Sequence, residues 1–163
     1  MLILGEPSAG KRNLARWLHA HGPRREHPLA EIPCRHLSEE QLDATLFGRA
    51  DGALGRGRGR RGIAELAEGG SLLLVGVDAL TLALQAKLLG VLEAGRFRRT
   101  GELQSRRIDV QFLATAGPDL PRLAEEGRFR RALYFCLAAL TLEMPPPGGR
   151  GEDAETAGKG TSR

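Results

Sequence analysis

Short apolar runs alternate with longer amphipathic segments along this chain. The runs predict strands at residues 2–4, 29–32, 71–75, 108–114 and 140–143. The longer segments predict helices at residues 11–21, 38–47, 82–93, 118–126 and 130–137, and a Gly/Arg-rich loop separates them at 48–62. Strands that alternate with helices predict βαβ units, and therefore an α/β fold with a parallel sheet between two layers of helices.

Composition narrows the class of protein. With 163 residues, 41% of them apolar and 27% charged, the chain suits one globular domain. The net charge of +4, carried mostly by arginine, permits contact with nucleic acid or nucleotide phosphates without demonstrating it. Cys34 and Cys136 form no CxxC motif, and Asp78 and Lys87 interrupt the longest apolar run. These features predict a cytoplasmic protein with reduced thiols and no membrane span.

The first βα turn carries the clearest chemical motif. Residues 5–11 read GEPSAGK, which fits the phosphate-binding pattern GxxxxGK in its required place between a strand and a helix. Glycines let backbone N–H groups surround phosphate oxygens, and Lys11 reaches the terminal phosphates. Arg12 stands where a Ser or Thr usually supplies a Mg²⁺ ligand. The predicted ligand is ATP, with or without Mg²⁺, and the predicted binding residues are Gly5, Glu6, Pro7, Ser8, Ala9, Gly10, Lys11 and Arg12. The alternative is an ordinary glycine-bearing turn.

The order of segments resembles the AAA+ ATPase domain of bacterial enhancer-binding proteins, the activators of sigma-54 RNA polymerase. The resemblance rests on the stretches GEPSAGKR, LFGRADGAL, AELAEGGSLLL, LALQAKLLGVLEAGRFRRTG and EEGRFRRALYFCL. In that family they carry the Walker A loop, the entry to the sigma-contacting loop, the lead into Walker B, a helix with a hairpin, and the arginine fingers. The resemblance implies a three-layer αβα P-loop domain that assembles with copies of itself or with AAA+ homologues.

Departures from the family pattern gather in the hydrolytic apparatus. The Walker B acids align with Val75 and Gly76, and the sensor asparagine aligns with Gly117. Asp78 is the nearest acid, but it lies three residues on, up to about 10 Å along an extended chain, so a helix cap is the favoured interpretation and a substitute acid the less favoured one.

Two further catalytic positions of the family pattern have changed. Arg130 matches one family arginine finger, whereas the other aligns with Cys136. An asparagine that holds the Walker B glutamate in the family aligns with Pro33. The sequence thus predicts a domain that binds ATP but hydrolyses it poorly.

Regions outside the ATPase machinery also differ from the family. The sigma-contacting loop aligns with residues 52–57, GALGRG, which lack the family's aromatic residue and threonine, so contact with sigma-54 is doubtful. The family segment before the first strand, the helical lid and the DNA-binding helix-turn-helix have no counterpart. We therefore expect an N-terminally truncated, lidless P-loop domain at residues 1–146 and a disordered tail at 147–163, which lacks an apolar pattern.

Alternatives to the nucleotide-binding hypothesis remain open. The P-loop could be a relic in an interaction protein or a decayed remnant that binds no nucleotide. The Arg/Gly loop at residues 55–62 could instead bind a nucleic-acid backbone, although a solvated loop without aromatic residues is the simpler interpretation. We expect no protein-bound metal site, since His19 and His21 lie two positions apart on a helix and point to different faces.

Overall fold

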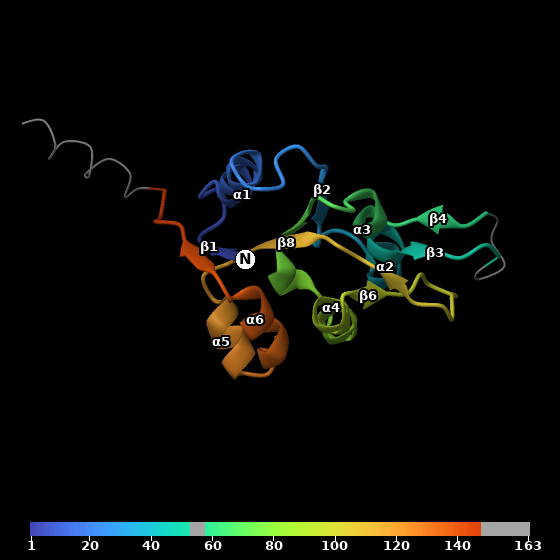
Figure 1. Cartoon of the computed structure of the whole chain (residues 1–163). Coiled ribbons are helices and arrows are strands. Elements are labelled where there is room, and N and C mark those ends of the chain that lie inside the picture. Colours follow the sequence, from blue (N-terminus) through green and yellow to red (C-terminus); the bar gives the residue numbers. More distant parts are fainter. Residues whose placement is uncertain (53–57, 148–163) are drawn as a thin grey trace, which may run out of the picture.

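A parallel five-stranded sheet forms the centre of the molecule (Figure 1). The computed structural model describes residues 1–52 and 58–147. The strands are β1 (Leu2–Leu4), β2 (Leu29–Pro33), β5 (Ser71–Val75), β8 (Gln111–Ala116) and β9 (Thr141–Glu143), in the spatial order β2-β5-β8-β1-β9. All four neighbouring pairs are parallel, which confirms the predicted α/β class.

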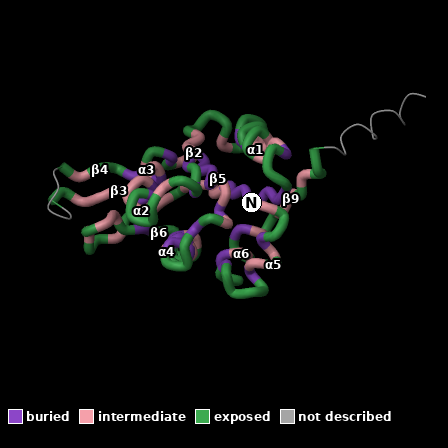
Figure 2. The backbone as a smooth tube through the Cα atoms, turned by 180° about the vertical axis from the view of Figure 1, so that it is seen from behind, coloured by how far each residue is buried: buried purple, intermediate pink, exposed green. Residues whose placement is uncertain are grey.

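Helices cover both faces of this sheet. Helix α1 (Lys11–Ala20) lies on one face, and α4 (Leu82–Ala94), α5 (Leu120–Glu125) and α6 (Arg131–Leu137) lie on the other (Figure 1). Because side chains alternate along a strand, Ile3 and Leu73 pack with Ala15 of α1, whereas their neighbours Leu72 and Leu74 pack into the opposite core. Buried residues accordingly follow the strands and the inner faces of the helices (Figure 2).

Side chains at two helix starts explain where those helices begin. Ser38 accepts a hydrogen bond from Gln41 N, and the Gln41 side chain accepts one from Ser38 N, so the predicted capping box opens α2 (Glu39–Phe47). Helix α4 is capped by Thr81, whose hydroxyl accepts from Leu84 N at 3.3 Å. The favoured interpretation of Asp78 as this cap was therefore wrong.

Two β-hairpins extend from one end of the sheet. The predicted loop at 48–62 was partly wrong, because β3 (Gly48–Arg49) pairs antiparallel with β4 (Arg60–Arg61); α3 (Ile63–Leu66) follows. The second hairpin, β6 (Arg96–Phe97) with β7 (Arg106–Arg107), is the one that the family resemblance implied. Thr100 joins the hairpins by donating from its N to Gly48 O and accepting from Ala50 N, each at 3.0 Å.

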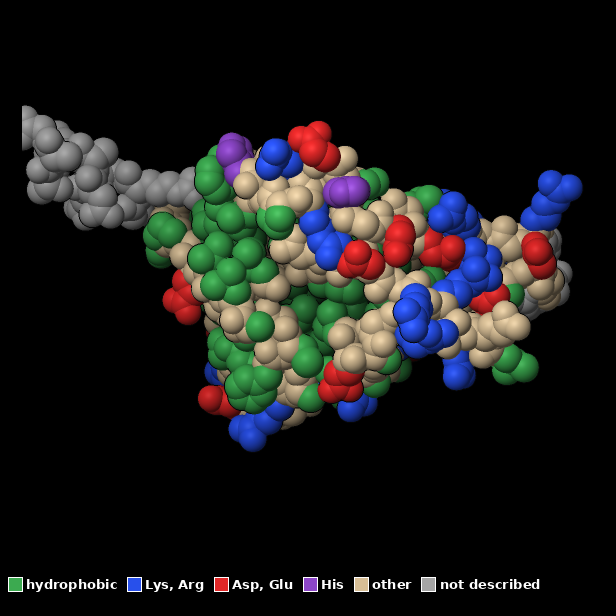
Figure 3. All heavy atoms as spheres, viewed as in Figure 1, with side chains coloured by type: hydrophobic (Ala, Val, Ile, Leu, Met, Phe, Trp, Pro, Cys, Tyr) green, Lys and Arg blue, Asp and Glu red, His purple; other side chains and the backbone are tan. Residues whose placement is uncertain are grey.

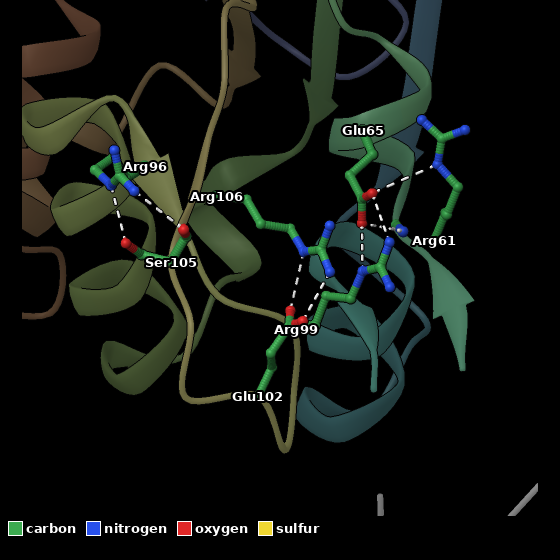
Figure 4. A network of polar contacts seen from close by, with 8 residues as sticks. Arg61, Glu65, Arg96, Arg99, Glu102, Ser105 and Arg106 are labelled. Atoms are coloured by element: carbon green, nitrogen blue, oxygen red, sulfur yellow. Dashed lines mark hydrogen bonds and ion pairs between the residues drawn. The ribbon is translucent and has the colours of Figure 1, made fainter. Parts of the chain in front are cut away.

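Ion pairs fix the orientation of these hairpins (Figure 4). The Glu65 carboxylate accepts two hydrogen bonds of 2.7 Å from Arg99 and lies 3.4 Å from Arg61. A second pair, Glu102 with Arg106, spans the β6–β7 hairpin at 2.7 Å. A partly buried carboxylate thus links α3 to both hairpins.

The remaining boundary predictions fall partly outside the structure. Strand β8 begins at residue 111 rather than 108, because Ile108 N bonds Gly95 O beside the hairpin. Residues 148–163, nearly all of the predicted tail, lie outside the described residues, as do 53–57 of the sigma-loop stretch. Within the described residues, no helix combines the length and apolar character needed to cross a membrane.

Candidate nucleotide site

The loop between β1 and α1 has the backbone conformation of a phosphate cradle. Gly10 (φ 87°) and Ser8 (φ 66°) both adopt left-handed conformations. A serine rarely adopts this conformation, and such strain concentrates at functional sites. Gly10 opens α1, and no side chain of the described residues caps that helix start. The first N–H groups of a helix have no intrahelical partner, and uncapped helix starts are a common place for anions to bind.

Lys11 closes over this loop. Its ammonium donates to Gly5 O at 2.6 Å and to Glu6 O at 2.7 Å. Burial lowers the pKa of Lys11, while the negative charges of Asp78 and Glu6 oppose the shift and the positive charge of Arg35 adds to it. The charge of Asp78 thus acts on Lys11, although the extended-chain distance had predicted that Asp78 would lie outside the site.

A cavity of about 350 Å³ opens beside Lys11, where the carboxyl ends of three strands meet. Its lining residues are Pro7, Lys11, Pro33, Arg35, His36, Val75, Gly76, Asp78, Thr115, Ala116 and Gly117. Carboxyl ends of parallel strands are where open α/β sheets bind ligands. Four positions that depart from the family pattern, Pro33, Val75, Gly76 and Gly117, therefore line one cavity together with Lys11, whereas Cys136 lies elsewhere.

The Walker B positions offer this cavity no acid. Val75 ends β5, and Gly76 follows it with φ 79°. Its N–H donates to the carbonyl and to the hydroxyl of Thr115, at 3.0 and 3.1 Å. A Cβ at Gly76 would lie 3.2 Å from Arg35 Nε. The backbone at position 76 thus has a conformation and surroundings that favour glycine over any residue with a side chain, including the family's acid.

Arg35 and Asp78 both line the cavity and form an ion pair there. Arg35 Nη2 donates to Asp78 Oδ2, while Asp78 Oδ1 is buried and has no hydrogen-bond partner among the described residues. Asp78 reaches the cavity because Gly76 and the 3₁₀ turn at Val77–Ala79 fold the chain back, so that a Cβ added at Gly117 would lie 3.8 Å from Asp78 Oδ2. The extended-chain distance had argued against this placement. No sequence motif pointed to Arg35.

Comparison with known proteins agrees with this geometry. The model of the sigma-54 interaction domain matches residues 1–143. The chain belongs to the sigma-54 interaction domain family. It is 41% identical over 154 residues to the anaerobic nitric oxide reductase transcription regulator NorR of Citrobacter koseri, covering 94% of this chain and 30% of that protein. It is 38% identical to the Nif-specific regulatory protein of Herbaspirillum seropedicae, again over 94% of this chain and 28% of that protein.

Solved structures give the same result. NtrX from Brucella abortus superposes with a TM-score of 0.81 at 30% identity, over 88% of this chain and 32% of that one. A structure of NtrX in complex with ATP superposes with a TM-score of 0.80 at 28% identity, over 88% of this chain and 31% of that one. The fold is thus the AAA+ P-loop type of sigma-54 activator domains. The chain spans about three tenths of the length of these two curated relatives.

Of the eight predicted binding residues of this sigma-54 interaction domain, only Pro7 and Lys11 are among the lining residues of the described cavity. Arg12 and the predicted finger Arg130 make contacts elsewhere. The Arg12 guanidinium pairs with Glu31 of β2 at 2.6 Å rather than lining the phosphate site. Arg130 Nε donates to Leu82 O at 3.0 Å, and its backbone N donates to the Gln85 side chain at 2.7 Å. Since an arginine finger acts on the nucleotide of a neighbouring subunit, the role of Arg130 stays a prediction.

Proposed function

We propose that this sigma-54 interaction domain binds ATP at the P-loop and holds it without rapid hydrolysis. The observation that carries the proposal is the strained loop from Gly5 to Gly10, with Lys11 folded over it beside a cavity. NtrX, a relative with the same fold, has been solved with ATP and with ADP. Phosphate binding needs only the loop, the lysine and the helix start, and this chain keeps all three.

Weak hydrolysis follows from what surrounds the cavity. The Walker B positions, Val75 and Gly76, supply no carboxylate base. The sensor position, Gly117, supplies no side-chain amide to position the attacking water. Loss of a positioned base alone lowers the rate about 10²–10⁴-fold. Asp78 lines the cavity, but its Oδ2 already accepts a hydrogen bond from Arg35 and is therefore not free to accept one from an attacking water.

The proposed role is transcription regulation through nucleotide-dependent protein contacts in the bacterial cytoplasm. Relatives in the family are named as transcription regulators. Oligomers with itself or with AAA+ homologues would place Arg130 near a neighbour's nucleotide. Contact with sigma-54 is not part of the proposal, because most of the aligned loop, residues 53–57, lies outside the described residues.

The test is titration of the purified chain with ATP and Mg²⁺ by calorimetry, beside Lys11→Ala. The proposal expects saturable micromolar binding that Lys11→Ala abolishes, and phosphate release that stays near background. Folded protein that binds no ATP would favour the interaction protein or decayed remnant. Rapid turnover would refute the claim of weak hydrolysis while leaving nucleotide binding intact.

A second candidate is nucleic-acid binding at the hairpin end of the molecule. Lys and Arg side chains gather there, with acidic side chains among them (Figure 3). Arg58, Arg60 and Arg61 of the Arg/Gly loop are all exposed. Binding by this route would weaken steeply with salt and survive Lys11→Ala. The acidic partners Glu65 and Glu102 neutralise part of this charge, so nucleotide binding remains the better-supported function.

A further inference from the structure

The ion pair between Arg35 and Asp78 lies in the same cavity as Lys11 of the phosphate loop. We infer that Arg35 replaces the metal, so that the domain binds a nucleoside polyphosphate without Mg²⁺ and the guanidinium carries the charge on the terminal phosphate. This inference rests on the proposed nucleotide binding and specifies its chemistry. Asp78 is the partner that holds the guanidinium until phosphate arrives.

The lining of the cavity does not fit Mg²⁺. This ion demands octahedral oxygen coordination and is usually held by one or two carboxylates together with phosphates and waters. Asp78 is the one carboxylate among the cavity's lining residues, and its Oδ2 is taken by Arg35. The Thr115 hydroxyl accepts a hydrogen bond from Gly76 N, and the residue after Lys11 is an arginine bound to Glu31. Among these lining residues, a metal ion would meet two cations, Lys11 and Arg35, and a single carboxylate, whose Oδ2 is engaged by Arg35 and whose Oδ1 is buried.

The same lining fits an unshielded phosphate. Two cationic side chains and one acidic side chain line the cavity, so an incoming anion meets an excess of positive charge. A guanidinium binds phosphate oxygens in a planar, two-pronged arrangement, which a lysine cannot reproduce. Arg35 therefore adds to the cavity a phosphate ligand that the P-loop motif does not include.

The contact between Arg35 and Asp78 can be replaced by a contact between Arg35 and phosphate. The Arg35 side chain is 58% exposed, whereas that of Asp78 is 14% exposed, so the guanidinium has room to turn and the carboxylate does not. Arg35 bonds one carboxylate oxygen only, and the other, Oδ1, is buried without a partner among the described residues. A phosphate that offers several oxygens competes well with such a single-point contact.

The experiment is titration with ATP by calorimetry, once in excess EDTA and once in Mg²⁺, for the wild-type chain and four variants. Arg35→Ala removes the proposed ligand, and Asp78→Asn removes the competing charge while keeping the shape. Lys11→Ala tests the P-loop itself. Arg25→Ala is the matched control, because Arg25 is 59% exposed, pairs only weakly with Glu26 at 3.2 Å, and does not line the cavity. Circular dichroism checks that each variant is folded.

Opposite effects of the two pair variants are the expected signature. Wild-type affinity in EDTA should lie within about threefold of that in Mg²⁺, which is under 1 kcal/mol. Arg35→Ala should weaken binding in EDTA about ten- to a hundredfold. Asp78→Asn should tighten it about fivefold or more, since a nearby negative charge is removed. Arg25→Ala should change nothing.

Three results would overturn the inference in distinguishable ways. Binding that appears only in Mg²⁺ and is weakened by Asp78→Asn would make Asp78 a metal ligand and leave the proposed function standing. Binding in EDTA that Arg35→Ala does not alter would remove Arg35 from the site, again without touching the proposed function. Binding in neither condition, or binding that survives Lys11→Ala, would refute the proposed function and this inference together.

Discussion

Asp78 accepts a hydrogen bond from Arg35 in the cavity at the carboxyl edge of the sheet. The contact exists because Gly76, in a left-handed conformation, turns the chain after β5 so that the next acid lines the same cavity as Lys11. The turn, the ion pair and the cavity therefore form one unit, and changes at Gly76 should affect all three.

Gly76→Ala should destabilise the fold by about 1–2 kcal/mol, because an L-residue with φ near 79° places its Cβ too close to the following carbonyl oxygen. The new Cβ would also approach Arg35 Nε at 3.2 Å. Gly90→Ala is the control: Gly90 lies in α4 with open space around it, so alanine should stabilise by about 0.5–1 kcal/mol. Urea unfolding would measure both, and equal effects of the two substitutions would contradict the explanation.

Restoring the family acids should not restore hydrolysis. The double variant Val75→Asp/Gly76→Glu should release phosphate near the wild-type rate, because the glutamate would inherit the left-handed strain of Gly76 and meet Arg35. The sensor position would still be Gly117. A steady-state phosphate assay is the measurement. A rise of more than about tenfold, equal to 1.4 kcal/mol of transition-state stabilisation, would show that the site lacks only its acids.

ATP binding should raise thermal stability through mass action. At a concentration about a hundred times its Kd, a ligand that binds only the folded state adds about 2.7 kcal/mol, which for a domain of this size shifts Tm by about 5–10 °C. Lys11→Ala should show no shift. Scanning calorimetry with and without ATP makes the comparison, and a shift of the same size in Lys11→Ala would place the nucleotide elsewhere on the protein.

The two thiols should differ in reactivity. Cys34 is 2% exposed, and burial, assisted by the charge of Asp78, raises the pKa of its thiol to about 12. Because the thiolate is the reactive form, Cys34 should stay unlabelled at pH 8 until the protein unfolds, whereas the exposed Cys136 should react in the native state. Titration with a chromogenic disulfide should count one fast thiol, and none in Cys136→Ser. Two fast thiols in the native wild type would contradict the burial of Cys34.

The sheet could be predicted from the sequence because its signal is local. Each buried run, such as Leu72 to Leu74, is short and bounded by glycines or polar residues, and the alternation with helices fixes parallel pairing. The hairpin at 48–61 was missed because its strands are two residues long and built from Gly and Arg, which carry no apolar alternation. Tertiary contacts through Thr100, rather than propensity, hold it.

The site was predictable only where a motif describes it. The phosphate loop follows from spacing, and the lost acids from the resemblance. Arg35 carries no signal, since one arginine after a strand is ordinary. The prediction for Asp78 used its distance along an extended chain. That estimate is wrong when a glycine such as Gly76 reverses the direction of the backbone. Such juxtapositions depend on turn geometry that the sequence pattern does not encode.

Acid should weaken the link between α3 and the hairpins. The hydrogen bonds from Arg99 hold the pKa of Glu65 below its usual value, although partial burial opposes this shift. A lowered carboxylate pKa contributes stability that is present above the unfolded-state value and lost as the pH falls through the folded-state value. Glu65→Gln should therefore cost about 1–2 kcal/mol at pH 7, and the difference from wild type should shrink as the pH falls below about 4.3.

Urea unfolding of wild type and Glu65→Gln across pH 3–7 is the measurement. Glu26→Gln is the matched control: the Glu26 side chain is 81% exposed and its pair with Arg25 spans 3.2 Å, so its removal should change stability by less than about 0.5 kcal/mol at every pH. The Glu65 side chain is only 11% exposed, and it meets Arg99 through two hydrogen bonds. If Glu65→Gln behaved like Glu26→Gln, the pair would not hold the hairpins, and their orientation would depend on other contacts, such as the backbone bonds of Thr100 and its hydroxyl bond to Asp43.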